Sequence, residues 1–144
     1  MPDLKFKQLQ YESDTWKRLL GFMMDENVHL KNRLSEVLKE EFDNSLLDEL
    51  DNFQNRFVKV DELISLLRND VAAFDKLFVS ERAKDEKFLH EINRELKKLR
   101  SNLLSADNMF GKLKLEFTSY LTENIVNEKN GNRKATWQNQ ISTR

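Results

Sequence analysis

Apolar residues recur along the middle of the chain at alternating intervals of four and three positions. Ten successive members of this series are Leu46, Leu50, Phe53, Phe57, Val60, Ile64, Leu67, Val71, Phe74 and Phe78. The spacing is that of one continuous face on a long α-helix that packs against other helices in the manner of a coiled coil. It predicts a helix from about Leu46 to Val79, roughly 50 Å long at a rise of about 1.5 Å per residue.

A second apolar series of the same length follows. Its members are Leu89, Ile92, Leu96, Leu99, Leu103, Ala106, Phe110, Leu113, Phe117 and Tyr120. The series stays in phase although Gly111 and the polar residues from Ser105 onward weaken the helix propensity, so one long helix is favoured over a break near Ser105 that starts a fourth helix. An unbroken helix would extend about ten residues beyond the preceding one. Phe110, Leu113 and Phe117 would then lack partners within the chain.

A first helix precedes these two. Its stripe consists of Trp16, Leu20, Met23, Asn27, Leu30, Leu34 and Val37. Two starts fit the pattern. Either Ser13 or Asp14 caps the first turn, or the helix begins near Asp3, because Leu9 and Phe6 continue the same phase toward the N-terminus.

The connections between the helices are expected where the apolar phase breaks. The first stripe loses its phase over residues 41–44, and Ser45 followed by Asp48 resembles an acidic variant of the capping box that begins a helix. The charged segment 80–87 separates the second and third stripes, and the second turn is placed there with Ser80 as a candidate cap. Since this segment holds neither glycine nor proline, a continuous helix through it is the alternative.

These patterns together predict an all-α fold, an antiparallel bundle of three long helices with coiled-coil-like packing, or of four if the third breaks. Residues 1–126 are expected to form one bundle domain, and residues 127–144 a polar, disordered tail. The chain holds three glycines and one proline, Pro2, so almost nothing in its interior stops a helix. Sheets and tight hairpins are therefore not expected.

Composition and charge narrow the classes of partner. Lys and Arg total 24 against 25 Asp and Glu, so no overall field draws the protein to nucleic acid or to a membrane surface. The absence of cysteine removes disulfides and thiolate chemistry and fits a reducing compartment. The longest apolar run, residues 19–24, is far shorter than the ~20 residues that span a bilayer, and the first residues lack the apolar core of a secretory signal. A soluble, cytoplasmic protein is expected.

Candidate chemistry is sparse. Glu26 and His29 have the Glu-x-x-His spacing of carboxylate-bridged di-iron bundles, but the other histidine, His90, has Lys87 where the second glutamate should stand. Both histidines fall on the outer faces in the register of the stripes, so no metal ligands are predicted. No nucleophile–base arrangement and no glycine-rich phosphate loop is evident either. We therefore predict no catalytic residues, no cofactor and a protein that is not an enzyme.

Asn27 stands out because it occupies a stripe position between Met23 and Leu30. A buried amide is unfavourable unless it finds a partner, and such residues often set helix register or oligomeric state. Register control, or capping of a neighbouring helix end, is the favoured interpretation. Contact with a ligand in a bundle cavity is the alternative.

Apolar residues outside the main stripes carry the signal for a partner. They are Phe22, Val28, Val58, Leu66, Leu104, Leu115, Ile125 and Val126. Scattered exposed apolar residues are normal, so a monomer is one interpretation and a second buried surface is the other. The predicted interface consists of Phe22, Leu66, Leu104, Phe110, Leu115 and Phe117. Trp137 and Ile141 lie one helical turn apart in the tail and are the candidates for docking into a groove. An incidental aromatic residue in a polar tail is the favoured interpretation.

The favoured function is therefore a non-enzymatic interaction or scaffold module that forms a homodimer or binds another helical protein. A bundle that binds a small ligand or a metal, with Trp16 and Asn27 lining a pocket, is the alternative. Binding to a membrane surface would need a basic face, for which the chain offers only Lys97, Lys98, Arg100, Lys112 and Lys114.

Overall fold

The structure consists of three long helices with short helical segments at their ends. It is a computed structural model that describes residues 2–40, 43–79 and 86–126. The long helices are α1 (Pro2–Lys39), α2 (Leu47–Val79) and α3 (Glu86–Tyr120). A 3-10 turn, η1 (Asn44–Leu46), leads into α2, and a π-helical segment, η3 (Leu121–Val126), follows α3. No strand occurs within the described residues, and the predicted all-α bundle is confirmed.

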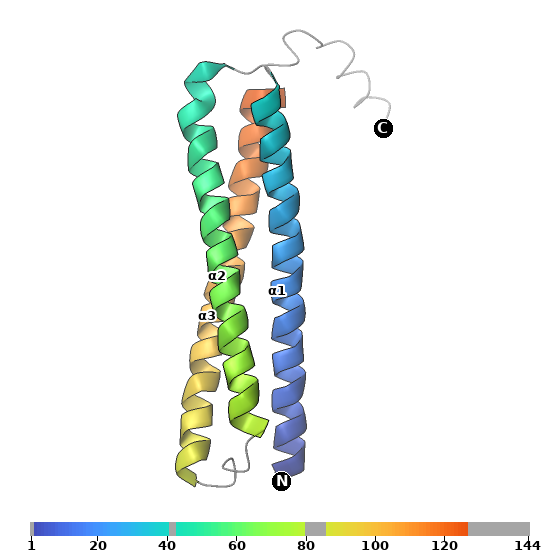
Figure 1. Ribbon diagram of the computed structural model, residues 1–144, viewed down its shortest axis with the longest axis vertical. Coiled ribbons are helices and arrows are strands. Elements are labelled where there is room, and N and C mark those ends of the chain that lie inside the picture. Colours follow the sequence, from blue (N-terminus) through green and yellow to red (C-terminus); the bar gives the residue numbers. More distant parts are fainter. Residues whose placement is uncertain (1, 41–42, 80–85, 127–144) are drawn as a thin grey trace, which may run out of the picture.

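The three helices lie side by side as one elongated bundle (Figure 1). Consecutive helices run in opposite directions, so that α1 and α3 run the same way. Their lengths are nearly equal, at 38 residues for α1, 33 for α2 and 35 for α3. Each helix is therefore covered along most of its length by the other two.

α3 is one unbroken helix through Ser105 and Gly111, as its apolar phase predicts. The expectation that Phe110, Leu113 and Phe117 lack partners within the chain is wrong, because all three are buried in the bundle. The reason is that α2 and α3 have nearly equal lengths, 33 and 35 residues, so α3 does not extend ten residues beyond α2.

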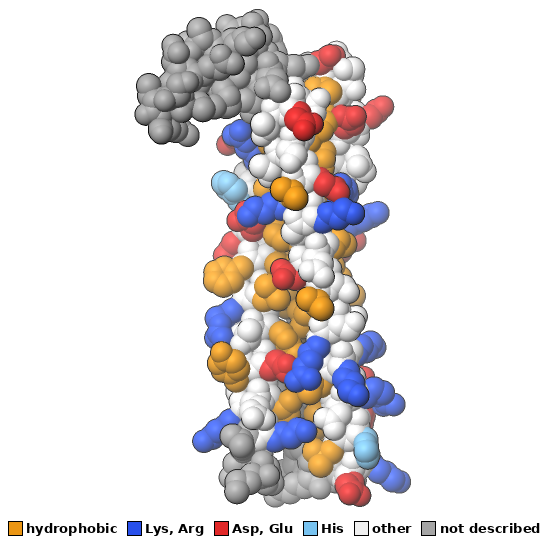
Figure 2. All heavy atoms as spheres, turned by 180° about the vertical axis from the view of Figure 1, so that it is seen from behind, with side chains coloured by type: hydrophobic (Ala, Val, Ile, Leu, Met, Phe, Trp, Pro, Cys, Tyr) orange, Lys and Arg blue, Asp and Glu red, His pale blue; other side chains and the backbone are white. Residues whose placement is uncertain are grey.

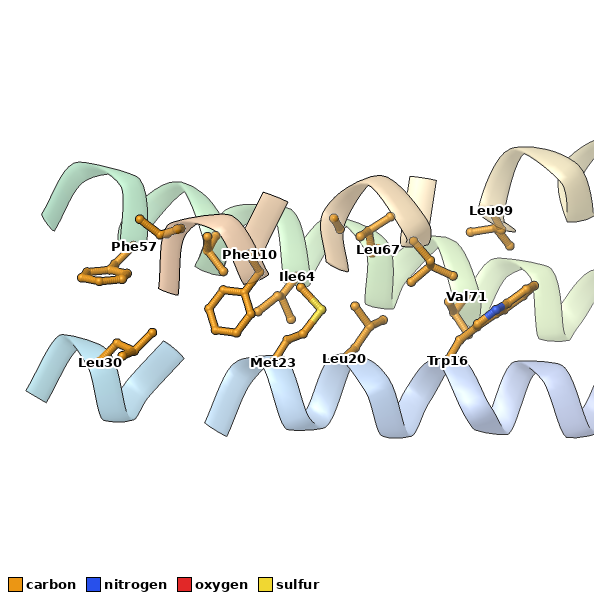
Figure 3. Close-up of a cluster of buried hydrophobic side chains, with 14 of the residues drawn as sticks. Trp16, Leu20, Met23, Leu30, Phe57, Ile64, Leu67, Val71, Leu99 and Phe110 are labelled. Atoms are coloured by element: carbon orange, nitrogen blue, oxygen red, sulfur yellow. The ribbon is translucent and has the colours of Figure 1, made fainter. Parts of the chain in front are cut away.

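The core is a single column of side chains contributed by all three helices. In Figure 3, Met23 of α1 points toward Ile64 of α2 and Phe110 of α3. Full burial of one such side chain contributes at most roughly 1.5–3 kcal/mol to stability. Most side chains on the outward faces are charged or polar. None of the helices in the described ranges carries an apolar stretch long enough to cross a membrane.

The helix starts differ in part from those predicted. α1 begins at Pro2, a residue suited to the first turn of a helix, and Ser13 lies inside the helix rather than at its cap. Before α2, the side chain of Asp43 accepts a hydrogen bond of 3.0 Å from the Ser45 backbone N–H, so Asp43 caps η1 in place of the predicted Ser45 and Asp48. This hydrogen bond lowers the pKa of the Asp43 carboxyl. The predicted second turn with Ser80 lies outside the described residues.

The burial of apolar residues at the start of α3 and in η3 also differs from the prediction. Phe88 is buried and Leu89 is 38% exposed. Both satisfy the spacing to Ile92, so the pattern alone does not separate them. Ile125, predicted on the outer surface, is buried. The π-helical turn η3 holds more residues per turn than an α-helix and rotates Ile125 onto the core side.

Candidate interaction surface

Large apolar side chains stand in solvent on the outer faces of the bundle. The exposed fraction is 71% for Phe22, 68% for Leu115 and 62% for Leu104. Figure 2 shows one face of the molecule, on which separate hydrophobic side chains project between charged ones. Single exposed apolar residues are common in soluble proteins, so the arrangement of these side chains decides whether they form a site.

Phe22 and Leu104 lie on the two sides of the groove between α1 and α3. Glu26 of α1 forms an ion pair with Lys114 of α3, so the side of α1 that carries Glu26 faces α3. Phe22 precedes Glu26 by four residues, which places it about 40° from Glu26 around the helix. In the same way, Leu104 follows Arg100 by four residues, and Arg100 pairs with Glu12 of α1.

Leu115 extends this surface along α3. The ion pairs match each position of α1 with the position 88 residues later in α3. Phe22 is therefore level with Phe110, between Leu104 and Leu115. Leu115 follows Leu104 by eleven residues, three helical turns, and points to nearly the same side of α3. We call Phe22, Leu104 and Leu115 the α1–α3 face.

Gly111 lies at the centre of the α1–α3 face. It is exposed, it is level with Met23, next to Phe22, and a Cβ added to it would meet no atom within 4 Å. Packing within the chain therefore does not require glycine here, although glycine in a helix costs roughly 0.5–1 kcal/mol relative to alanine. The effect is an open space flanked by three apolar side chains.

Leu66 is not part of the α1–α3 face. Arg56 of α2 pairs with Glu116 of α3 at 2.6 Å, so the side of α2 that carries Arg56 faces α3. Asp70 follows Arg56 by 14 residues, two heptads, and lies on that same side. Leu66 lies four residues before Asp70 and therefore borders the groove between α2 and α3. Leu66 is 56% exposed. The predicted interface residues thus divide into the α1–α3 face, Leu66 on a separate face, and Phe110 and Phe117 in the core.

Sequence reasoning missed several members of the exposed apolar set, among them Tyr11 and Met109. Tyr11 precedes Phe22 by eleven residues and lies on nearly the same side of α1. That spacing was visible in the sequence. Met109 is partly exposed beside α2, and its heptad position next to the apolar stripe of α3 hid it.

Asn27 is fully buried, as its stripe position predicts. Its amide group donates one hydrogen bond of 3.0 Å to the Phe57 carbonyl and another of 2.7 Å to Oδ1 of Asp61. The Lys31 ammonium pairs with the other oxygen of Asp61. The side-chain oxygen of Asn27 meets no donor within the described part of the chain. Asn27 therefore joins α1 to α2 rather than capping a helix end.

Two shallow grooves lie between helices elsewhere. One of about 240 Å³ runs between α2 and α3 near Leu77 and Glu95, and one of about 350 Å³ between α1 and α3 near Leu9 and Asn93. Charged and apolar groups line both grooves, and neither is lined by Trp16 or Asn27. The ring of Trp16 packs on Phe74 with centroids 5.8 Å apart.

Candidate metal ligands are not gathered in one place. His29 and His90 are both exposed, as the stripe register predicts. The ammonium of Lys114 lies 2.7 Å from the Glu26 carboxylate and lowers its pKa. Across residues 2–40, 43–79 and 86–126, no three histidine or acidic side chains are placed to hold a metal ion together. Trp137 and Ile141 lie outside the described residues.

Comparison of the chain with protein-family models, with curated proteins and with solved structures found no match.

Proposed function

We propose that this chain is an interaction module that pairs with a second copy of itself through the α1–α3 face. The observation that carries the proposal is the gathering of Phe22, Leu104 and Leu115, each more than 60% exposed, around the bare backbone of Gly111. A partner helix laid across Gly111 would reach the three apolar residues with different side chains. Apolar anchors that enter such a space supply most of the binding energy of an interface.

Charge favours a second copy as the occupant. Arg18 lies one turn before Phe22 and Asp25 one turn after it, on the same side of α1. A two-fold axis through Phe22 would place Arg18 of one copy opposite Asp25 of the other and the reverse. Opposite charges arranged in this way favour the antiparallel pairing of two copies and select against shifted ones.

Sedimentation equilibrium at tens of micromolar protein tests the proposal. We expect a dimer for the unchanged chain, and a monomer for Phe22→Asp and for Leu115→Asp. Leu66→Asp is the matched control, because Leu66 is similarly exposed on another face, and it should leave the dimer intact. Circular dichroism checks that each variant keeps its helices.

Each outcome decides the question. A monomer for the unchanged chain would overturn self-association, and binding to a helix of another protein would then be the function to test. A dimer that Leu66→Asp disrupts and Phe22→Asp does not would place the interface on the other side of the bundle and reject the α1–α3 face.

A further inference from the structure

We infer that a set of polar contacts, repeated after 14 residues along α1, sets the register in which α2 and α3 pack on α1. The apolar stripes alone do not do this, because sliding one helix by seven residues brings apolar positions opposite apolar positions again. Something else must disfavour the shifted arrangements. The structure places charged and buried polar groups where they do so.

The first copy of the set surrounds Asn27, and the second surrounds Ser13. Ser13 is fully buried, and its hydroxyl donates a hydrogen bond to Asp75 of α2. Lys17 pairs with the other oxygen of Asp75, as Lys31 does with Asp61. A buried polar residue on α1 and a lysine four positions later thus share one aspartate of α2 in both copies.

The residue just before each buried polar group reaches α3. The Glu12 carboxylate accepts hydrogen bonds from Nε of Arg100 at 3.0 and 2.7 Å. It accepts a further one of 2.6 Å from Nη2 of Arg100. Glu26 pairs with Lys114 at 2.7 Å. Each copy therefore connects all three helices at one level, and we call the two levels the polar layers.

The numbering shows that the layers belong to one register. Ser13 with Asp75 and Asn27 with Asp61 both add up to 88, as antiparallel helices in a single register require. Arg100 follows Glu12 by 88 residues, and Lys114 follows Glu26 by 88, as parallel helices require. Four helical turns, about 21 Å, separate the two layers.

A shift of α2 by seven residues in either direction brings the wrong charge into a layer. Arg68 lies halfway between Asp61 and Asp75 on the same side of α2. Asp75 and Asp61 pair with Lys17 and Lys31 of α1, so the position opposite Arg68 is halfway between these lysines. That position holds the uncharged Met24. A shift one way places Arg68 beside Lys17, and a shift the other way places it beside Lys31. Either shift also removes the acceptor of a buried polar side chain, which is unfavourable.

On α3 the signs of the charges are reversed: two basic residues pair with α1, and an acidic residue lies between them. Asp107 lies halfway between Arg100 and Lys114, and its counterpart on α1 is Leu19. A shift of α3 by seven residues places Asp107 beside Glu12 or beside Glu26, depending on its direction. Like charges at close range oppose both shifts.

Distances between two spin labels test the inference on the full chain. Because the chain contains no cysteine, Ser35→Cys on α1 and Ser65→Cys on α2 provide two unique label sites, and both serines are exposed. The unchanged layers should give one distance. The triple variant Ser13→Leu, Asn27→Leu and Arg68→Leu should give a second population, displaced along the bundle by about 10 Å, the length of seven residues.

A milder variant covers the case in which the triple variant does not fold. Asp61→Asn with Asp75→Asn and Arg68→Gln removes both the charges that favour the observed register and the charge that opposes the shifted ones, and it keeps the approximate size of the side chains. It should also give the second distance. Glu62→Gln with Asp70→Asn, which lie outside the layers on α2, is the matched control and should give one distance. If folded layer variants show only the original distance, apolar packing and the connections set the register and the inference is wrong.

Discussion

The rings of Phe57 and Phe117 meet edge to face, with centroids 5.0 Å apart and planes at 88°. Phe117 also contacts the ring of Phe53 at 5.2 Å. These contacts join the first third of α2 to the last turns of α3 and close the end of the bundle. Phe117 therefore stabilises the fold and is not accessible to a partner. The surface available to a partner lies on the outer faces.

Phe117→Ala should lower the free energy of unfolding by about 3–5 kcal/mol, because it removes a fully buried aromatic side chain and its two ring contacts. Urea denaturation followed by circular dichroism measures this. Leu115→Ala, two residues earlier and exposed, is the control and should change stability by no more than about 0.5 kcal/mol. Equal effects of the two changes would contradict the assignment of Phe117 to the core.

Gly111 offers a test that separates folding from association. Gly111→Ala should stabilise the chain by about 0.5–1 kcal/mol, since alanine favours the helix and the added Cβ meets open space. Gly111→Gln should keep the fold but fill the space on the α1–α3 face and weaken the dimer.

Gly21 provides the matched control for Gly111. It is also helical with open space around its Cβ, and it follows Lys17 by four residues, on the side of α1 that faces α2. Gly21→Gln should therefore leave the dimer unchanged in sedimentation. A dimer that tolerates Gly111→Gln as well as Gly21→Gln would argue against the proposed face.

The Glu26–Lys114 pair predicts a pH dependence. The hydrogen bond from Lys114 lowers the pKa of Glu26 below its ordinary value of 4.5. Since the folded pKa is lower than the unfolded one, the pair stabilises the fold above about pH 4.5 and loses this effect as the pH falls through the folded pKa. Lys114→Met should flatten the decline of the melting temperature between pH 5 and pH 3.

The size of this pH effect should be modest, because both side chains are partly exposed and the solvent screens their interaction. Lys112→Met, a change of charge at an exposed position of α3, is the control and should leave the slope as it is. An unchanged slope in Lys114→Met would show that other carboxylates dominate acid unfolding.

The fold was largely readable from the sequence, because a strict apolar period determines both the helices and their buried faces. α2 ends at Val79 as predicted, and the predicted stripe residues of α1 from Leu9 to Val37 are buried, whereas Phe6 is 41% exposed. The period does not encode helix ends. Whether α1 began at Asp3 or at Ser13 depended on whether Ser13 capped the helix or pointed into the core, and the pattern permits both.

The candidate surface was less readable because burial depends on the relative lengths of helices. Phe110 and Phe117 were assigned to an interface because α3 was expected to extend about ten residues beyond α2, although the two predicted helices, like the observed ones of 35 and 33 residues, are nearly equal in length. Phe22, Leu104 and Leu115 were found because they break the apolar period. Ser13 was missed as a core residue because serine is common at helix caps. The repeat of Glu, a polar residue and a lysine at 12–17 and 26–31 was present in the sequence.

The contact between Asn27 and Asp61 yields the most specific energetic prediction. Asn27→Ala removes two donated hydrogen bonds and leaves the Phe57 carbonyl and Asp61 without that donor, so it should cost about 1–3 kcal/mol. Replacing both partners, as in Asn27→Leu with Asp61→Leu, should cost less than the two single changes added together.

A double-mutant cycle on Asn27 and Asp61 measures that difference as a coupling energy, which we expect to exceed roughly 0.5 kcal/mol for groups in direct contact. The matched cycle pairs Asn27 with Asp75 of the other polar layer, about 21 Å away along the bundle. Those two changes should be additive within about 0.5 kcal/mol. Additivity in the first cycle would mean that the Asn27–Asp61 hydrogen bond does not contribute to stability, and coupling in the second would mean that the polar layers act as one unit.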